Sequence, residues 1–182
     1  MKMEKNKKQL NRLVLSAVFL ALGMILPFFT MQIKEIGDSL LPMHIPVMLC
    51  GIMCGGGYGF IVGAVLPIIR AFVFGMPPLY PNALWMSAEL LTYGCVVGVL
   101  YNRGLKKYLW WLYVSLILSM LSGRIVWGIA KALLLSSSGK IFTFGAFIAG
   151  GFIDSLPGII LQFLLIPLIV ILMNSYQNSK KC

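Results

Sequence analysis

The chain is poor in charged residues, and acidic residues are the scarcest. Only 11% of its 182 residues are charged, with 5 Asp and Glu against 15 Lys and Arg, whereas a soluble domain has about 25%. Hydrophobic residues make up 59% of the chain. This composition excludes an ordinary soluble domain, and the apolar runs are long enough to cross a bilayer repeatedly.

Cysteine and histidine are also scarce. Cys50 and Cys54 lie four residues apart in an apolar run, and the other two cysteines, Cys95 and Cys182, are isolated. A zinc site would need a second pair of ligands or a nearby histidine, and a disulfide framework would need a different pattern. We therefore expect no metal and no cofactor. The single histidine, His44, lies between two prolines, where we favour helix-end capping or loop packing over metal binding.

The positions of the basic residues argue against nucleic-acid binding. The lysines and arginines lie at the ends of apolar runs, which is the pattern that the positive-inside bias produces in membrane proteins. No patch of interleaved basic and aromatic residues is present to bind RNA or DNA. We interpret the basic balance as a signal of membrane topology.

The apolar pattern predicts an all-α integral membrane protein with a single domain over residues 1–182. Six spans are expected, at about 13–31, 44–55, 58–74, 82–101, 108–135 and 142–173. The first run is long and has no small-residue cleavage site, so we interpret it as a retained helix and not as a signal peptide. The second run is short at about 1.5 Å per residue, and it is either tilted or enters only part of the bilayer.

Six spans place both termini on the same side. Three cationic clusters, at the N-terminus, at residues 103–107 and at the C-terminal tail, then share that side. The positive-inside rule assigns this side to the cytoplasm. The loops at about 32–43, 75–81 and 136–140 lie on the outer side, and only the first of them is rich in charges, of mixed sign.

Two ionised residues stand in apolar segments on either side of a Pro-rich corner, residues 75–78. These are Arg70 and Glu89. A charge at the bilayer centre costs about 2.5–3.5 kcal/mol on insertion scales, so such groups pair with each other, line a cavity or bind a ligand. A direct ion pair between Arg70 and Glu89 across the corner is one interpretation, and a binding site is the other.

Polar residues recur at helical spacing in three of the expected spans. They form the stripes Asn82–Trp85–Glu89–Tyr93, Arg124–Trp127–Lys131 and Asp154–Gly158–Gln162. Spacings of three and four place each stripe on one helix face, and Glu89 and Asp154 lie roughly 10–17 Å below the outer edge by helix rise. A pocket in the outer half of the bundle would produce this pattern, and so would a buried salt-bridge network. Trp85 and Trp127 either form a wall for a ligand or pack without contacting one.

Several local features carry a resemblance to a known family. Ala17 and Ala21 form a shallow notch on the first span, the segment 41–51 reads LPMHIPVMLCG, and GMPP at 75–78 precedes a Glu-bearing span. With its length, six spans and long first external loop, the chain resembles the S components of energy-coupling factor (ECF) transporters, which capture vitamins in the bacterial cell membrane. The resemblance covers nearly the whole chain.

The resemblance implies partners and a site. Ala17 and Ala21 would face the transmembrane coupling subunit (T component), and two ABC-type ATPase subunits would hydrolyse ATP. The candidate substrate-binding residues are His44, Arg70, Asn82, Trp85, Glu89, Tyr93, Arg124, Trp127, Lys131 and Asp154. Three cations against two carboxylates leave one net positive charge, which favours an anionic ligand. Pantothenate fits, and this sequence type looks similar to members assigned to it. A pyridoxine-like compound or a pyrimidine thiamine precursor comes next, and cobalamin and folate stay open.

Two other classes of protein fit the sequence less well. An intramembrane serine protease would need Ser and His at the same depth, and a lipid phosphotransferase would need clustered carboxylates for Mg²⁺. A stand-alone channel or small exporter would work without an ATPase. The chain has no nucleotide-binding loop, so an ATP-driven process must use partner subunits. We therefore expect a transport subunit and not an enzyme.

Overall fold

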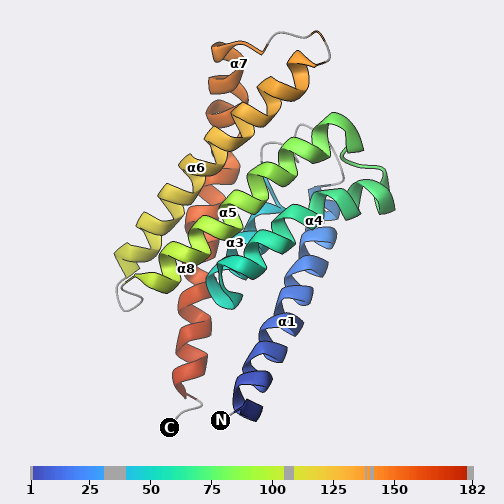
Figure 1. Cartoon of the computed structure of the whole chain (residues 1–182). Helices are drawn as coiled ribbons and strands as arrows, with labels where there is room; N and C mark the ends of the chain where they lie inside the picture. The colour runs from blue at the N-terminus through green and yellow to red at the C-terminus, as the bar shows by residue number, and fades with distance from the viewer. Residues whose placement is uncertain (1, 31–39, 105–108, 138, 140–141, 180–182) are drawn as a thin grey trace.

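The computed structural model describes the chain except for residues 1, 31–39, 105–108, 138, 140–141 and 180–182. The described residues form helices and no strands (Figure 1). The principal helices are α1 (Lys2–Ile25), α3 (His44–Cys54), α4 (Gly56–Phe74), α5 (Leu84–Arg103), α6 (Leu109–Ser136) and α8 (Leu156–Ser179). Shorter elements are η1 (Leu26–Thr30), η2 (Leu79–Ala83), α7 (Phe144–Ile148) and η3 (Ala149–Ile153).

Five helical stretches in the described residues are long and apolar enough to cross a membrane. They are Met3–Phe28, Gly56–Phe74, Leu79–Arg103, Leu109–Ser136 and Phe144–Met173. Helices suit this environment because every internal backbone hydrogen bond is made within the element. The expected second span corresponds to α3, which has 11 residues and is about 16 Å long by helix rise. A membrane crossing by this second span, which would bring the total to six, stays a prediction.

Two helices differ from their expected bounds. Helix α1 begins at Lys2, so the basic segment before residue 13 is helical as well. The expected span 142–173 is divided into α7, the π-helical turn η3 and α8. A Gly-Gly pair at Gly150 and Gly151 lies in η3, and Pro157 occupies the first turn of α8, where proline is tolerated because its missing N–H is not needed.

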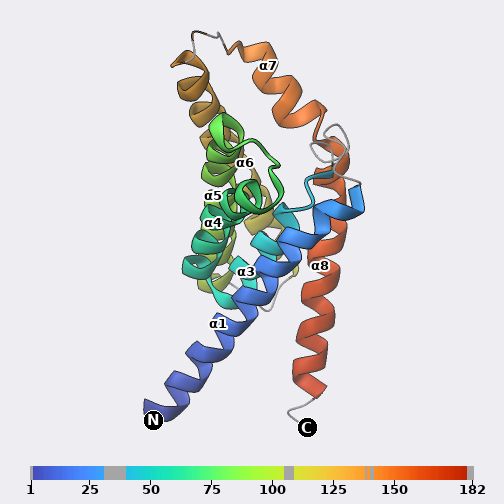
Figure 2. The same ribbon diagram turned by 90° about the vertical axis from the view of Figure 1, so that its right-hand side faces the viewer.

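Helix α3 forms the centre of the bundle. Nearly all of its residues are buried, and α1, α4, α5 and α8 pack around it (Figures 1 and 2). A helix that is hydrophobic on all sides is expected to be enclosed by other elements. The composition of this segment, HIPVMLCGIMC, therefore explains its central position.

Helices α4 and α5 approach each other through small residues. The backbone of Gly94 lies so close to that of Gly59 that a Cβ on either glycine would overlap the backbone of the other helix. A Cβ on Gly63 would lie 2.5 Å from the carbonyl carbon of Leu90. Small residues at helix interfaces allow this close contact in membrane proteins. The pairing fixes the rotation of α5 about its axis, and with it the direction of the face that carries Glu89 and Tyr93.

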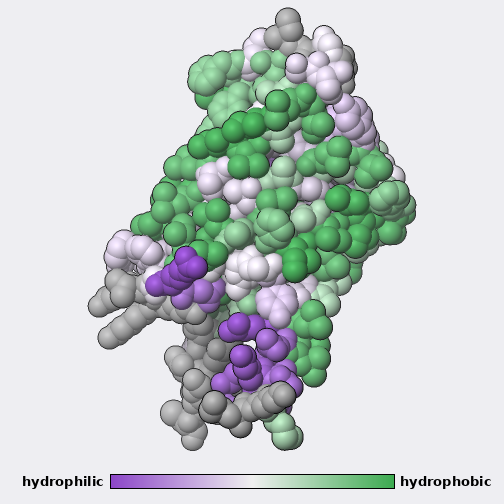
Figure 3. Space-filling view, viewed as in Figure 1, coloured by the Kyte–Doolittle hydropathy of each residue, from purple (hydrophilic) through white to green (hydrophobic). Residues whose placement is uncertain are grey.

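The surface is divided between apolar and hydrophilic regions. Figure 3 shows hydrophobic residues over most of the visible face and hydrophilic residues at the end where α1 begins and α5 ends. Helix α8 ends on the same side of the molecule as the start of α1 (Figures 1 and 2). The expected cationic residues at 105–107 and 180–181, and the charges at 34–38, lie outside the described residues.

Candidate functional site

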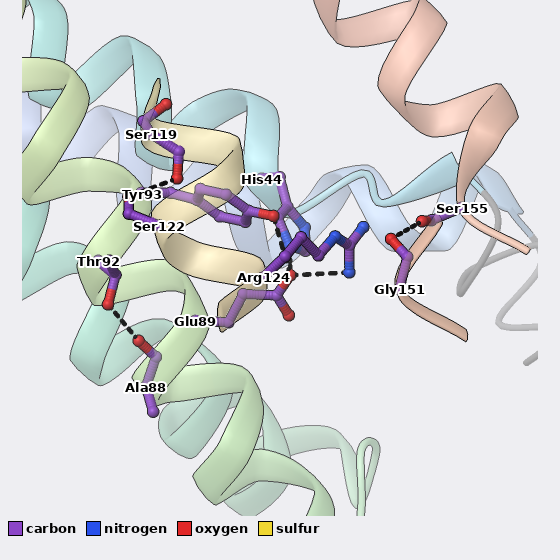
Figure 4. A network of polar contacts seen from close by, with 10 residues as sticks. All are labelled: His44, Ala88, Glu89, Thr92, Tyr93, Ser119, Ser122, Arg124, Gly151 and Ser155. Atoms are coloured by element: carbon purple, nitrogen blue, oxygen red, sulfur yellow. Dashed lines mark hydrogen bonds and ion pairs between the residues drawn. The ribbon is translucent and has the colours of Figure 1, made fainter. Parts of the chain in front are cut away.

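A buried carboxylate on α5 is the centre of a polar cluster. Glu89 is 2% exposed, and its Oε1 lies 2.9 Å from Nη1 of Arg124 on α6. The hydroxyl of Tyr93 donates a hydrogen bond to the same oxygen at 3.1 Å, and Nε2 of His44 is 3.5 Å away. Figure 4 shows these side chains converging from three helices. We refer to His44, Glu89, Tyr93 and Arg124 as the polar cluster.

Helix geometry explains how the polar cluster assembles. Glu89 and Tyr93 are four residues apart on α5 and therefore share a face. Helix α6 packs beside α5 and supplies Arg124. His44 is the first residue of α3, so the carboxylate lies near a helix N-terminus, whose partial positive charge favours an anion. The His44 ring also packs edge-on against Tyr93, with 5.2 Å between the ring centroids.

Several buried polar atoms of this region have no hydrogen-bond partner among the described residues. They include Nη2 of Arg124, Nε2 of Gln162 and both ring nitrogens of His44. The 3.5 Å contact from His44 to Glu89 is longer than a hydrogen bond. A buried donor left unpaired costs about 1–3 kcal/mol. Such atoms in a native fold require an explanation, and a missing ligand is one.

A cavity of about 160 Å³ adjoins the polar cluster. It lies between α6 and α8, next to Arg124 and Tyr93. Figure 4 shows the guanidinium of Arg124 joined to Glu89 by a dashed line, on the side that faces the segment carrying Gly151 and Ser155. The residues lining the cavity are Tyr93, Ile117, Met120, Leu121, Arg124, Phe152, Ile159, Gln162 and Phe163. The cavity therefore has an almost wholly apolar wall, and its lining includes Arg124 and Gln162, the two residues with unpartnered buried donors.

A second cation lies in a cage of aromatic rings. The ammonium of Lys131 is 4.5 Å from the ring centroid of Trp127, 5.4 Å from that of Trp85 and 5.3 Å from that of Phe142. The guanidinium of Arg124 is 5.9 Å from the Trp127 centroid on the same helix. Cation–π attraction of this kind is strongest where water is excluded, and Trp127 is buried. The tryptophan therefore separates the two cations of the stripe on α6.

Two of the sequence-predicted site residues, Arg70 and Asp154, lie outside the polar cluster and the aromatic cage. Arg70 donates from Nη1 to the carbonyl of Met24 at 2.8 Å, and its guanidinium lies over the rings of Phe28 and Phe74. It therefore ties α4 to the end of α1, and the direct ion pair between Arg70 and Glu89 that the sequence left open is not formed. Asp154 is exposed after η3, and no ion pair joins it to another described residue.

The remaining predictions are placed as follows. Asn82 is half-buried in η2, just before α5, and is not part of the polar cluster. Ala17 and Ala21 are exposed on α1, whereas Ser16 and Phe19 face the bundle. Gln162 was seen only as a member of a polar stripe and was not predicted to bind substrate. Its signal was a lone amide in the apolar run of α8.

Comparisons with known proteins agree with this architecture at the level of family. The family model described as "ECF transporter, substrate-specific component" matches residues 11–170. Comparison with curated proteins and with solved structures finds no significant match. The match to the family model spans most of the chain, and the bundle of apolar helices is that of an integral membrane protein. The chain therefore belongs to the family of ECF transporter substrate-specific components.

Proposed function

We propose that the chain captures a small, water-soluble, anionic vitamin for an ECF-type ABC importer, with pantothenate as the first candidate. The observation that carries this proposal is that only one of the two terminal nitrogens of Arg124 is paired with Glu89. Its Nη1 is bound by Glu89, whereas its buried Nη2 has no hydrogen-bond partner among the described residues, and Arg124 is one of the residues that line the cavity. A carboxylate is the natural acceptor for a buried arginine donor.

The local charge supports an anion. Among the described residues, the polar cluster contains the cation Arg124 and the carboxylate Glu89, and the aromatic cage adds the cation Lys131. Arg70 donates a hydrogen bond to α1 and does not contribute its charge to this site. Cationic groups of this kind favour a ligand with a negative charge.

The aromatic cage favours a second candidate. Trp85, Trp127 and Phe142 surround Lys131, and flat rings are suited to hold a planar ligand by stacking. A pyridoxine-like compound or a pyrimidine thiamine precursor would use this wall. Cobalamin and folate are larger alternatives, for which the cavity of about 160 Å³ provides less support.

We propose that the other components of the importer bind to one face of α1. Ala17 and Ala21 are small and exposed, so a helix of the T component can approach closely there. Two ABC-type ATPases would bind the T component and hydrolyse ATP. The proposed topology has six crossings in the bacterial plasma membrane, with α3 enclosed as the second crossing and both termini in the cytoplasm.

The experiment is mass spectrometry of small molecules that co-purify with the protein. We expect a carboxylate-containing vitamin in the wild-type sample and its loss from Arg124→Gln. Arg70→Gln is the matched control, because Arg70 lies away from the cavity, and this variant should retain the same molecule. A neutral or cationic ligand retained by both variants would contradict the proposal.

A further inference from the structure

The cavity extends from Arg124 in the direction opposite to Lys131. Ile117, Met120 and Leu121 of α6 line it together with Arg124, whereas Lys131 lies about two helical turns farther toward the other end of α6. A ligand bound between the two cations would therefore leave the cavity empty. A ligand bound at Arg124 can extend into it.

The lining of the cavity is unsuited to a second polar end of a ligand. Its wall consists of aliphatic, methionine and phenylalanine side chains apart from Tyr93, Arg124 and Gln162. A closed cavity of comparable size, about 150 Å³, takes up a benzene-sized molecule, whereas this cavity is partly open, because its lining residues Ile117 and Leu121 are 45% and 47% exposed. At about 160 Å³, this cavity has room for an uncharged group of about six carbon atoms.

Gln162 supplies a donor on the opposite wall from Arg124. Its side chain is 1% exposed, it belongs to α8, and its Nε2 has no partner among the described residues. A membrane acyl chain in this cavity would leave the amide of Gln162 and Nη2 of Arg124 unpaired. A ligand with a carboxylate between the two helices would provide acceptors for both, which favours the substrate as the occupant.

We propose that the cavity holds the uncharged, compact aliphatic end of the substrate, and that Gln162 helps to bind its carboxylate. The substrate class is then a monocarboxylate whose charge lies at Arg124 and whose aliphatic part lies between α6 and α8. This class disfavours pantothenate, because pantothenate carries hydroxyl and amide groups beyond its carboxylate, and it keeps only the anionic part of the proposed function. This inference rests on the proposed function, because it assumes that Arg124 binds an anion. It adds a specificity-determining residue on α8 and a limit on the length of the buried group.

A homologous series of straight-chain carboxylates tests the inference. The wild-type protein in phosphatidylcholine nanodiscs is titrated with acetate, butyrate, hexanoate and octanoate, with tryptophan fluorescence as the readout. The dissociation constant should fall about fourfold for each added methylene, which corresponds to about 0.8 kcal/mol, and this gain should stop near six carbons. Primary alcohols of the same lengths are the control for partitioning into lipid, and they should bind far more weakly.

Two kinds of variant separate the roles of the cavity and of Gln162. Leu121→Phe, or Ile159→Phe should the first variant fail to fold, narrows the cavity, and each should abolish the gain in affinity with chain length, so that octanoate binds no more tightly than butyrate. Gln162→Leu should weaken binding of every carboxylate about three- to tenfold. The melting temperature of empty Gln162→Leu should stay the same or rise, because an unpaired buried donor has been removed, and this distinguishes ligand binding from a structural role.

Each contrary outcome has a distinct meaning. Carboxylates that bind with an affinity independent of length would overturn the cavity assignment and leave the proposed function standing. Unchanged affinities in Gln162→Leu would overturn the role of that residue. Alcohols that bind as tightly as carboxylates would identify a pocket for lipid chains and overturn the inference. No binding of any carboxylate would overturn the inference together with the anionic substrate.

Discussion

Arg124 binds Glu89 through Nη1 at 2.9 Å, and its Nη2 has no hydrogen-bond partner among the residues that the structure describes. Both side chains are almost completely buried, at 5% and 3% exposure. A buried ion pair offsets much of the desolvation cost of its two charges, but it adds little stability unless the remaining hydrogen-bonding groups are also satisfied. The pair is therefore better suited to orient a guanidinium for a ligand than to stabilise the empty protein.

Arg124→Lys should lower the affinity for an anionic substrate about ten- to a hundredfold. A lysine keeps the charge, but its single ammonium cannot occupy both guanidinium positions that face Glu89 and the cavity. The loss of one charge-assisted hydrogen bond corresponds to about 1.5–3 kcal/mol. Calorimetric titration of the ligand identified by mass spectrometry measures the change. Arg70→Lys is the matched control, with affinity expected within about twofold of wild type.

Glu89→Gln should lower the melting temperature of the empty protein. The substitution leaves Arg124 as an uncompensated buried charge, and breaking a buried pair in this way costs about 3–5 kcal/mol. An anionic ligand would neutralise Arg124 in the variant, so saturating ligand should narrow the difference in melting temperature between variant and wild type. A variant as stable as wild type without ligand would show that Glu89 is not the counter-ion of Arg124.

The local part of this site was predictable from helical spacing, but its long-range partners were not. The spacing of Arg124, Trp127 and Lys131 placed them on one face of a helix, and the structure has both cations in contact with the same tryptophan ring. The choice of Arg124 over Arg70 as the partner of Glu89 depends on how α4, α5 and α6 pack. Spacing within one helix contains no information on that choice.

Helix breaks and cavities are a second feature that could not be predicted from the sequence. Asp154 was placed on a continuous span, but the chain bends through η3 before α8 begins, and this residue is exposed. Gln162, eight residues later on the same expected stripe, is buried and lines the cavity. The cavity is lined by residues of both α6 and α8, so it is a property of tertiary packing and not of either helix alone.

Gly94→Ala should destabilise the protein more than Gly57→Ala does. A Cβ at this position would overlap the backbone of Gly59 on α4, so the two helices must separate. Overpacking of this kind costs about 1–3 kcal/mol. Gly57→Ala is the matched control, because nothing lies within 4 Å of its added Cβ. Thermal unfolding in detergent compares the two variants, and equal melting temperatures would mean that α4 and α5 do not approach so closely.

Ala17→Trp should abolish uptake and leave substrate binding nearly intact. Ala17 is exposed and points away from the polar cluster, so a bulky side chain there would block close approach of a partner helix without reaching the site. Leu22→Trp is the control, since Leu22 is also exposed on α1 but lies about 140° around the helix. Uptake in cells and binding to purified protein measure the two effects. Normal transport by Ala17→Trp would show that Ala17 and Ala21 are not part of the interface with the T component.

The topology prediction can be tested with two positions at opposite ends of one helical stretch. Arg103 ends α5 and Met76 precedes η2, and both residues are exposed. Asn102 is less suitable for labelling, because its side chain donates to the carbonyl of Ile52 at 3.2 Å and so ties α5 to α3.

In a cysteine-free background, Met76→Cys should react with an impermeant thiol reagent in intact cells, whereas Arg103→Cys should react only after the cells are opened. The positive-inside rule requires this result if the basic end of α5 is cytoplasmic. Labelling of Arg103→Cys alone in intact cells would invert the proposed topology, and labelling of both would show that this stretch does not cross the membrane.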